Sequence, residues 1–200
     1  MSGEGNQLLQ KLDEFIRKYY LNQLIRGALL STGLLVAFFL AFAALEYYGR
    51  FGITGRTIFF YSLLLVSAIA LTQWVVSPLI RLWNIRPGIS YDEAASIVGK
   101  HFSNIEDRLL NTLQLQRSAA NSQSELLMAS IDQRITELRP VPFATAIDLK
   151  ENKQFLRYAL PPLLLLVLIL VIAPSLVTEG TRRIVNHRTA FENLAPFLFN

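Results

Sequence analysis

Three stretches of about twenty apolar residues constrain this chain more than any other feature of its sequence. They run from Gly27 to Leu45, from Thr57 to Val76 and from Tyr158 to Val177. A helix needs roughly 20 apolar residues to cross a bilayer core about 30 Å thick, and each stretch meets that length. Hydrophobic residues make up 52% of the 200 residues and charged residues only 17%, which is unusual for a soluble domain. We therefore predict an all-α membrane protein with three transmembrane helices.

The pattern between the apolar stretches predicts how the rest of the chain is organised. No cleavage site for a signal peptide follows the first stretch, so we expect all three spans to be retained. We expect the following segments: an amphipathic N-terminal helix at 1–26, a hairpin of two spans at 27–80, a small cytoplasmic helical lobe at 81–157, the third span at 158–177, and an extracytoplasmic tail at 178–200 that could begin a further domain.

The N-terminal segment has the apolar spacing of an amphipathic helix. Its apolar face consists of Leu8, Leu12, Phe15, Ile16 and Tyr19. Such a helix could lie on an anionic membrane surface, or it could dock on the central segment or on a partner. The sequence leaves these alternatives open.

Helix start and stop signals divide the central segment. Ser90 with Glu93, and Ser103 with Glu106, each fit the capping-box pattern, so a helix is expected to begin at each. A third helix is indicated where Leu127, Ile131, Ile135 and Leu138 follow helical spacing, and a fourth is expected to start at Asp148 and to continue into the third span. A lobe of about 70 residues is close to the lower size limit for independent folding.

The distribution of basic residues predicts the orientation of the spans. Basic residues flank the N-terminal and central segments, whereas the short connection between the first two spans holds only Arg50 and Arg56. By the positive-inside rule, the N-terminus and the lobe are cytoplasmic and the C-terminus is periplasmic, in a bacterial inner membrane. Three arginines in the tail argue for the opposite orientation. Aromatic residues near the span ends are typical interface anchors, and these are Tyr47, Tyr48 and Trp74.

The third span contains three prolines, Pro161, Pro162 and Pro174, which could kink it. Pro161 and Pro162 fall in the first turn of the apolar stretch and Pro174 in its last turn, where a missing N–H has the smallest effect. No charged residue lies within the three predicted spans. We therefore favour an anchor over a moving element, while a swing at the Pro-Pro pair remains the alternative.

Small residues recur on one face of the first span at four-residue spacing, at Gly33, Ala37 and Ala41. Such a face allows another helix to approach closely. The neighbour could be another span of this chain, which we favour, or the span of a partner subunit.

Residues that could carry chemistry do not form a recognisable site. Adjacent acidic pairs, such as Asp92 with Glu93, point away from each other on a helix and suit the first turns of helices. His101 and His187 are isolated and are predicted to lie on opposite sides of the membrane, which argues against a shared metal site. The absence of cysteine excludes disulfides and thiolate chemistry. We expect no enzyme activity, no cofactor, no metal and no small-molecule substrate.

The net charge of +4 and pI near 9.5 do not indicate nucleic-acid binding, because the basic residues flank the spans instead of forming a stripe with aromatics. Membrane lipid and other membrane protein subunits are the expected partners, and a homo-oligomer is an alternative. The tail ends in apolar residues at 194–199, which either dock on a partner or lead into a further domain.

Two segments carry a resemblance to a known group of proteins. The stretch "PGISYDEAASIVGKHFSNIEDRLLNTLQL", and "EGTRRIVNHRTAFENLAPFLF" after the last apolar span, resemble the N-terminal three-span membrane region of a family of large uncharacterised envelope proteins of Bacteroidota. The resemblance implies an inner-membrane region followed by a longer extracytoplasmic part. It implies no catalytic residues, because the family has no established activity.

These features together predict a non-enzymatic anchor or scaffold subunit of the bacterial envelope that assembles with partner proteins. An accessory component of a transporter or channel is one alternative, and it would need a polar path formed by oligomerisation. A membrane-bound regulatory or signal-relay protein is the second alternative.

Overall fold

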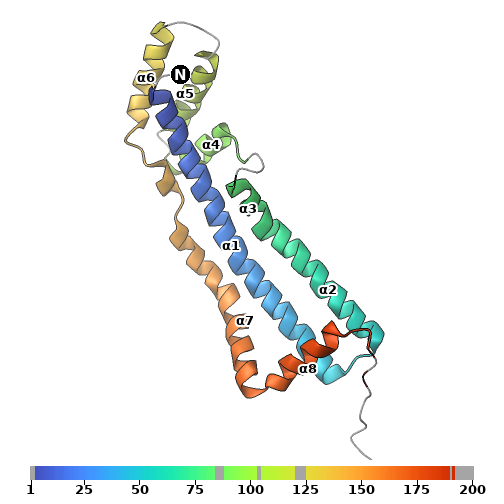
Figure 1. Ribbon diagram of the computed structural model, residues 1–200. Coiled ribbons are helices and arrows are strands. Elements are labelled where there is room, and N and C mark those ends of the chain that lie inside the picture. The colour runs from blue at the N-terminus through green and yellow to red at the C-terminus, as the bar shows by residue number, and fades with distance from the viewer. Residues whose placement is uncertain (1–2, 84–87, 103–104, 120–124, 190, 192–200) are drawn as a thin grey trace, which may run out of the picture. The chain divides into compact units, whose positions relative to one another are not determined.

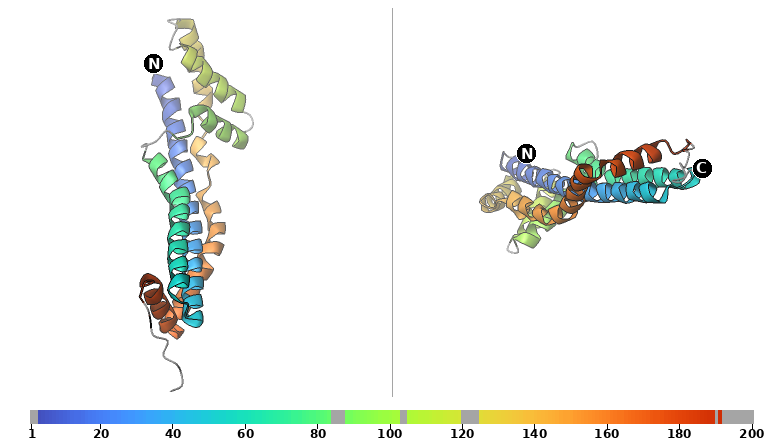
Figure 2. Two further views of the ribbon diagram at one scale, coloured as in Figure 1. Left: turned by 90° about the vertical axis from the view of Figure 1, so that its right-hand side faces the viewer. Right: turned by 90° about the horizontal axis from the view of Figure 1, so that it is seen from below.

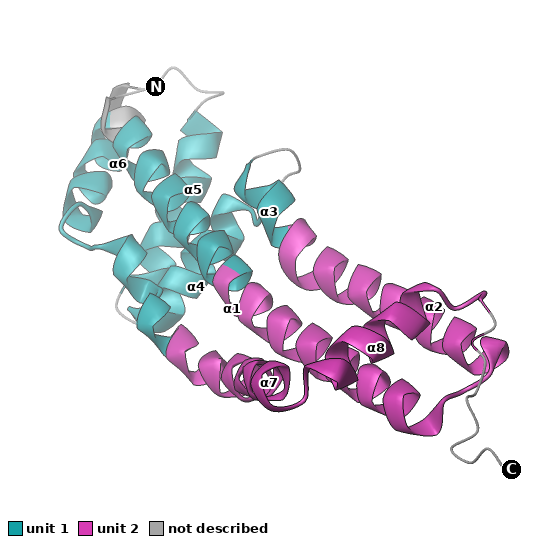
Figure 3. Ribbon diagram, turned by 60° about the horizontal axis from the view of Figure 1, so that its bottom comes forward, with its two compact units in different colours: residues 1–24, 78–151 teal, residues 25–77, 152–200 magenta. Residues whose placement is uncertain are grey.

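The computed structural model describes residues 3–83, 88–102, 105–119, 125–189 and 191. Its described residues form helices and turns and contain no strand, which confirms the all-α prediction (Figure 1). Figure 3 colours two compact units: one comprises Met1–Leu24 and Pro78–Glu151, and the other comprises Ile25–Ser77 and Asn152–Asn200. From here on, the lobe means the first unit, which includes the N-terminal part of the chain in addition to most of the predicted lobe. We call the second unit the span unit.

Three helical segments are long and apolar enough to cross a membrane. They are Gly5–Gly49, Ile53–Leu82 and Phe143–Ile172. The chain is therefore a multi-pass membrane protein, as the sequence predicts. The second segment combines α2 (Ile53–Leu71), a π-helical turn η1 (Thr72–Val76) and α3 (Ser77–Leu82) without a break.

Helix α1 runs without interruption from Gly3 to Gly49 and contributes to both units. At 1.5 Å per residue its 47 residues span about 70 Å, more than twice the thickness of a bilayer core. The sequence between residues 20 and 30 contains no proline and only one glycine, Gly27, so nothing ends the helix where the predicted N-terminal segment meets the predicted span. One helix thus serves as both segments.

The N-terminal part of α1 forms part of the core of the lobe. Leu8, Leu12 and Phe15 are buried against apolar side chains of α4 (Tyr91–His101), α5 (Glu106–Ala119) and α6 (Glu125–Leu138). Of the alternatives that the sequence left open, docking on the central segment is therefore the one observed.

The predicted helix signals of the lobe can be followed in the structure. Ser90 accepts a hydrogen bond from the Glu93 N–H at 3.2 Å, and the Glu93 carboxylate accepts one from the Ser90 N–H at 2.9 Å, which confirms the first capping box. Ile131, Ile135 and Leu138 are buried on α6, as their spacing predicts. Ser103 and the side chain of Leu127 lie outside the described residues.

Polar contacts attach α1 to the rest of the lobe. The Lys11 ammonium donates to the carbonyl oxygens of Arg139 and Val141, and the Lys18 ammonium donates to that of Ala144 at 2.7 Å. The Tyr20 hydroxyl accepts a hydrogen bond from the Ile89 N–H at 2.7 Å. The two lysines thus satisfy carbonyl groups of the segment that follows α6, and the Tyr20 hydroxyl satisfies a backbone N–H just before α4.

The helices of the span unit approach each other at glycines of α1. A β-carbon at Gly27 would collide with the Trp74 carbonyl of η1, and one at Gly33 would collide with the Tyr158 carbonyl of α7 (Lys153–Ile172). Figure 2 shows α1, α2 and α7 side by side in both of its views. Close backbone contact of this kind is how helices associate in lipid, where no hydrophobic driving force acts between them.

The third apolar helix begins and ends earlier than the predicted span at 158–177. A 3-10 turn η3 (Leu149–Asn152) begins after Asp148, whose carboxylate accepts from the Lys150 N–H at 2.8 Å, and α7 follows directly. Pro161 and Pro162 consequently lie inside α7.

Pro174 begins a separate helix, α8 (Pro174–Val185), instead of closing the last turn of the third span. The break at Ala173, with φ −139° and ψ 64°, has a simple cause. A residue before proline is pushed out of the α region, and proline itself is favoured at the first helical position.

Candidate functional site

A buried cluster of charges occupies the ends of α1 and α2 in the span unit. The Glu46 side chain at the end of α1 is fully buried, and its Oε1 lies 3.4 Å from Arg183 Nη1 and 3.7 Å from Arg56 Nε. The exposed fraction of the Arg56 side chain is 4% and that of Arg183 is 16%. We call these three residues the charge cluster.

Each arginine of the charge cluster has further contacts. Arg56 Nε donates to the Phe51 carbonyl at 2.9 Å, and its Nη1 donates to the Thr189 carbonyl at 3.0 Å. The guanidinium carbons of Arg56 and Arg183 lie 4.9 Å and 5.3 Å from the centre of the Phe191 ring, within range of cation–π attraction. Residues that are distant in sequence are thus tied together by one carboxylate.

Helix α8 positions Arg183 in this cluster. Its buried face consists of Leu176, Val177, Gly180 and Ile184. A β-carbon at Gly180 would lie 2.6 Å from the Ala43 carbonyl oxygen, so the glycine allows α8 to contact the backbone of α1. Figure 1 shows α8 lying across the ends of α1 and α2.

The buried imidazole of His187 lies one turn after Arg183. It stacks on Phe60 of α2 with ring centres 4.5 Å apart, and it forms an edge-to-face contact with Tyr61 with ring centres 5.8 Å apart. Within the described part of the chain, neither ring nitrogen has a hydrogen-bond partner, nor does Glu46 Oε2. The histidine therefore packs as an aromatic residue that attaches the end of α8 to α2.

Two positive charges around one carboxylate make the cluster suitable for holding helices together. A buried ion pair that loses one partner leaves an uncompensated charge, so the three side chains depend on one another. The same arrangement offers no nucleophile next to a base. This geometry supports a structural role, in which the ion pairs fix α8 to α1 and α2.

The small residues predicted to share one face do not share one environment. Gly33 is buried against Tyr158 and Ala159 of α7, whereas Ala37 and Ala41 are exposed. The close approach that small residues permit is thus used at Gly33 by this chain's own third span. Ala37 and Ala41 remain accessible on α1.

The predicted interface anchors lie in different environments. Tyr47 packs partly against the apolar cluster formed with α8, while 76% of Tyr48 is exposed near the end of α1. Trp74 lies in η1, where 39% of it is exposed, and the helix continues beyond it to Leu82. Trp74 is therefore eight residues from the end of its helical segment.

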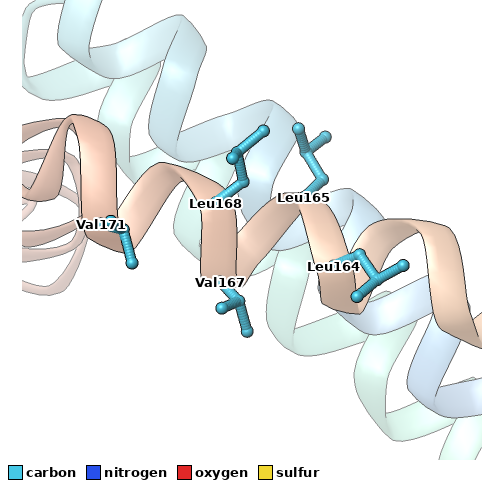
Figure 4. Close-up of a pocket in the computed structure, with 5 residues that line it drawn as sticks. All are labelled: Leu164, Leu165, Val167, Leu168 and Val171. Carbon is cyan, nitrogen blue, oxygen red and sulfur yellow. The ribbon is translucent and has the colours of Figure 1, made fainter.

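The exposed surface of the spans is strongly apolar. Only 11% of the most apolar window of the second span and 6% of that of the third are buried within the chain. A shallow, open hollow on α7 is lined by leucines and valines alone (Figure 4), at Leu164, Leu165, Val167, Leu168 and Val171. All five come from one helix, and such a surface suits lipid acyl chains.

The lobe carries an open polar cleft between α5 and α6. Its lining residues are Arg108, Thr112, Ser130, Gln133, Arg134 and Glu137. Arg108 and Glu137 form an exposed ion pair at 3.7 Å across it. The described residues include no group of three side chains placed to hold a metal ion.

Comparison of the chain with known protein families, with curated proteins and with solved structures yields no match. Sequence reasoning missed the charge cluster, although Glu46 and Arg56 directly border apolar stretches. Charged residues at the border of a span could have indicated a buried ion pair. Their association with Arg183 depends on the return of α8 to α1, which local patterns do not reveal.

Proposed function

We propose that this protein is a non-enzymatic anchor and scaffold subunit of the bacterial inner membrane, which assembles with partner proteins of the cell envelope. The observation that carries the proposal is the division of α1 between the two units. Its first residues form part of the core of the lobe, and its later residues form the first apolar span. A folded surface built on the same helix that spans the bilayer is the arrangement that a membrane-bound platform requires.

The proposed scaffold has its lobe in the cytoplasm and the end of α8 in the periplasm, following the basic residues that flank the lobe. The natural absence of cysteine makes this testable with single introduced thiols. Ser118 on α5 and Arg188 after α8 are both exposed. In intact spheroplasts, an impermeant maleimide should label Arg188→Cys and leave Ser118→Cys unlabelled until the cells are lysed. The reverse pattern would invert the topology.

Assembly is tested by cross-linking in native membranes, followed by purification in mild detergent and mass spectrometry of the intact complex. A scaffold should co-purify with partner proteins in stoichiometric amounts. A wild-type protein recovered alone after cross-linking would refute the proposal.

The accessible small residues of α1 provide a sharper test of how partners bind. Replacing Ala37 and Ala41 by leucine should abolish recovery of the partner proteins if a partner span packs there, because bulky side chains prevent close approach. Ala68→Leu is the matched control, since Ala68 is also exposed, but on α2. If both variants recover equal amounts of the partner proteins, this face of α1 is excluded as the binding site, and the lobe becomes the next candidate.

A further inference from the structure

The basic residues around the charge cluster are all arginines. Positions 46–57 and 174–191 contain no lysine, and their basic residues are Arg50, Arg56, Arg182, Arg183 and Arg188, against only two acidic residues, Glu46 and Glu179. All five lysines of the chain lie elsewhere. The guanidinium group binds phosphate with two parallel hydrogen bonds, which the ammonium group of lysine does not.

Within the described residues, two of these arginines have polar partners and three do not. Arg56 and Arg183 are held by Glu46, and Arg56 also donates to the backbone carbonyls of Phe51 and Thr189. Arg50, Arg182 and Arg188 are exposed, and within the described residues their side chains take part in no hydrogen bond or ion pair.

The contacts of the charge cluster bring the other three arginines to one end of the span unit. The contact of Arg183 with Glu46 places α8 beside the end of α1, four residues before Arg50. The hydrogen bond from Arg56 to the Thr189 carbonyl places the residue after Arg188 beside the start of α2.

This end of the span unit coincides with the end of the apolar surface. Val171 and Ile172, the last residues of α7, are 77% and 73% exposed, and the chain then turns into α8, whose exposed residues are mostly polar. Tyr48, with 76% of its surface exposed, lies two residues before Arg50 and is a typical residue of the headgroup region. With the apolar surface in the bilayer core, a positively charged side chain here would lie at the depth of lipid phosphate groups.

We propose that the exposed side chains of Arg50, Arg182 and Arg188 form a binding surface for the phosphate groups of anionic phospholipids. The surface has a net positive charge because Glu179 is the only exposed acidic residue on α8. Engagement of a headgroup by Arg182 and Arg188 holds the outer face of α8 at the membrane, while the charge cluster holds its inner face. This role is independent of any partner protein, so it stands apart from the scaffold proposal.

The test uses the full chain in detergent, titrated with phosphatidylglycerol or phosphatidylcholine and followed by native mass spectrometry. Wild-type protein should bind phosphatidylglycerol more tightly than phosphatidylcholine. The variant R50Q/R182Q/R188Q should lose about fivefold in affinity for each arginine, hence about a hundredfold in total. The control K100Q/R134Q/K150Q removes the same charge from exposed residues of the lobe and should retain binding within about twofold.

Other outcomes would overturn the proposal. Equal binding of the two lipids would show that the protein does not recognise the anionic headgroup. An equal loss of affinity in both triple variants would reduce the effect to net charge. Displacement of phosphatidylglycerol by an excess of inorganic phosphate would identify a site for free phosphate instead of lipid. Circular dichroism of each variant before titration ensures that a loss of binding is not a loss of fold.

Discussion

Replacing Glu46 by glutamine should release α8 from the ends of α1 and α2. The substitution keeps the size of the side chain and removes the carboxylate that, within the described residues, contacts both Arg56 and Arg183. Removing one partner of a buried ion pair typically costs about 3–5 kcal/mol, because the remaining charge is left without compensation. The distances of 3.4 Å and 3.7 Å are long for hydrogen bonds, so we expect a value near the lower limit.

Limited proteolysis measures this opening directly. Arg182 lies within α8, so trypsin cleaves after it only when the helix is locally unfolded. The rate of this cleavage follows the population of the open state when closing is fast. A change of about 3 kcal/mol corresponds to roughly a hundredfold faster cleavage in lipid nanodiscs. Glu179→Gln is the matched control on the same helix, since Glu179 is exposed, and it should change the rate little.

A double-mutant cycle makes the reasoning refutable. If Glu46 stabilises the positive charge of Arg183, then Arg183→Gln should cost less in the Glu46→Gln background than in the wild type. Additive effects, or equal cleavage of Glu46→Gln and Glu179→Gln, would show that the charge cluster does not hold α8.

Three further predictions concern the lobe and the third span. Ser90→Ala removes the cap of α4 and should destabilise the lobe by about 0.5–2 kcal/mol in denaturant titrations, an effect that Ser90→Asp should avoid. Burial, and then the hydrogen bond to Asp13, raise the pKa of Tyr91 above its usual value of 10.0. A raised pKa in the folded state contributes stability below pH 10.0, and this stability is lost as the pH rises through the folded pKa. Above pH 10.0 the melting temperature should therefore fall less steeply with increasing pH in Tyr91→Phe than in the wild type. Spin labels at exposed positions Thr32 of α1 and Val171 of α7, beyond the Pro-Pro pair, should give one narrow distance distribution, whereas a bimodal distribution would show that the third span swings.

The existence of the spans could be predicted because the requirement is local. A run of about twenty apolar residues must satisfy its backbone groups within a helix, whatever its neighbours are. The start of α4 was predictable for the same reason, since the reciprocal hydrogen bonds between Ser90 and Glu93 lie within one turn. Helix ends were harder to place. The sequence alone did not show that α1 continues from the lobe into the span, or that Ala173 separates α7 from α8.

Contacts between distant segments were not predictable from spacing. Packed helices cross at an angle, so a neighbour contacts one stretch of a helix and not a whole face. Gly33 therefore meets α7 while Ala37 and Ala41 stay exposed. Glu46 likewise bordered a span without any local sign of its partner Arg183, more than 130 residues later in the chain.

The position of Gly33 bears on whether the prolines of the third span make it an anchor or a moving element. Pro162 has no N–H, so the carbonyl of Tyr158, four residues earlier, loses its helical donor. This carbonyl is the atom that Gly33 approaches, and the absence of a side chain there allows the α1 backbone to cover it. A swing of α7 at the Pro-Pro pair would uncover an unpaired carbonyl to lipid, where no water can satisfy it. The glycine and the proline thus stabilise one arrangement, which favours an anchor.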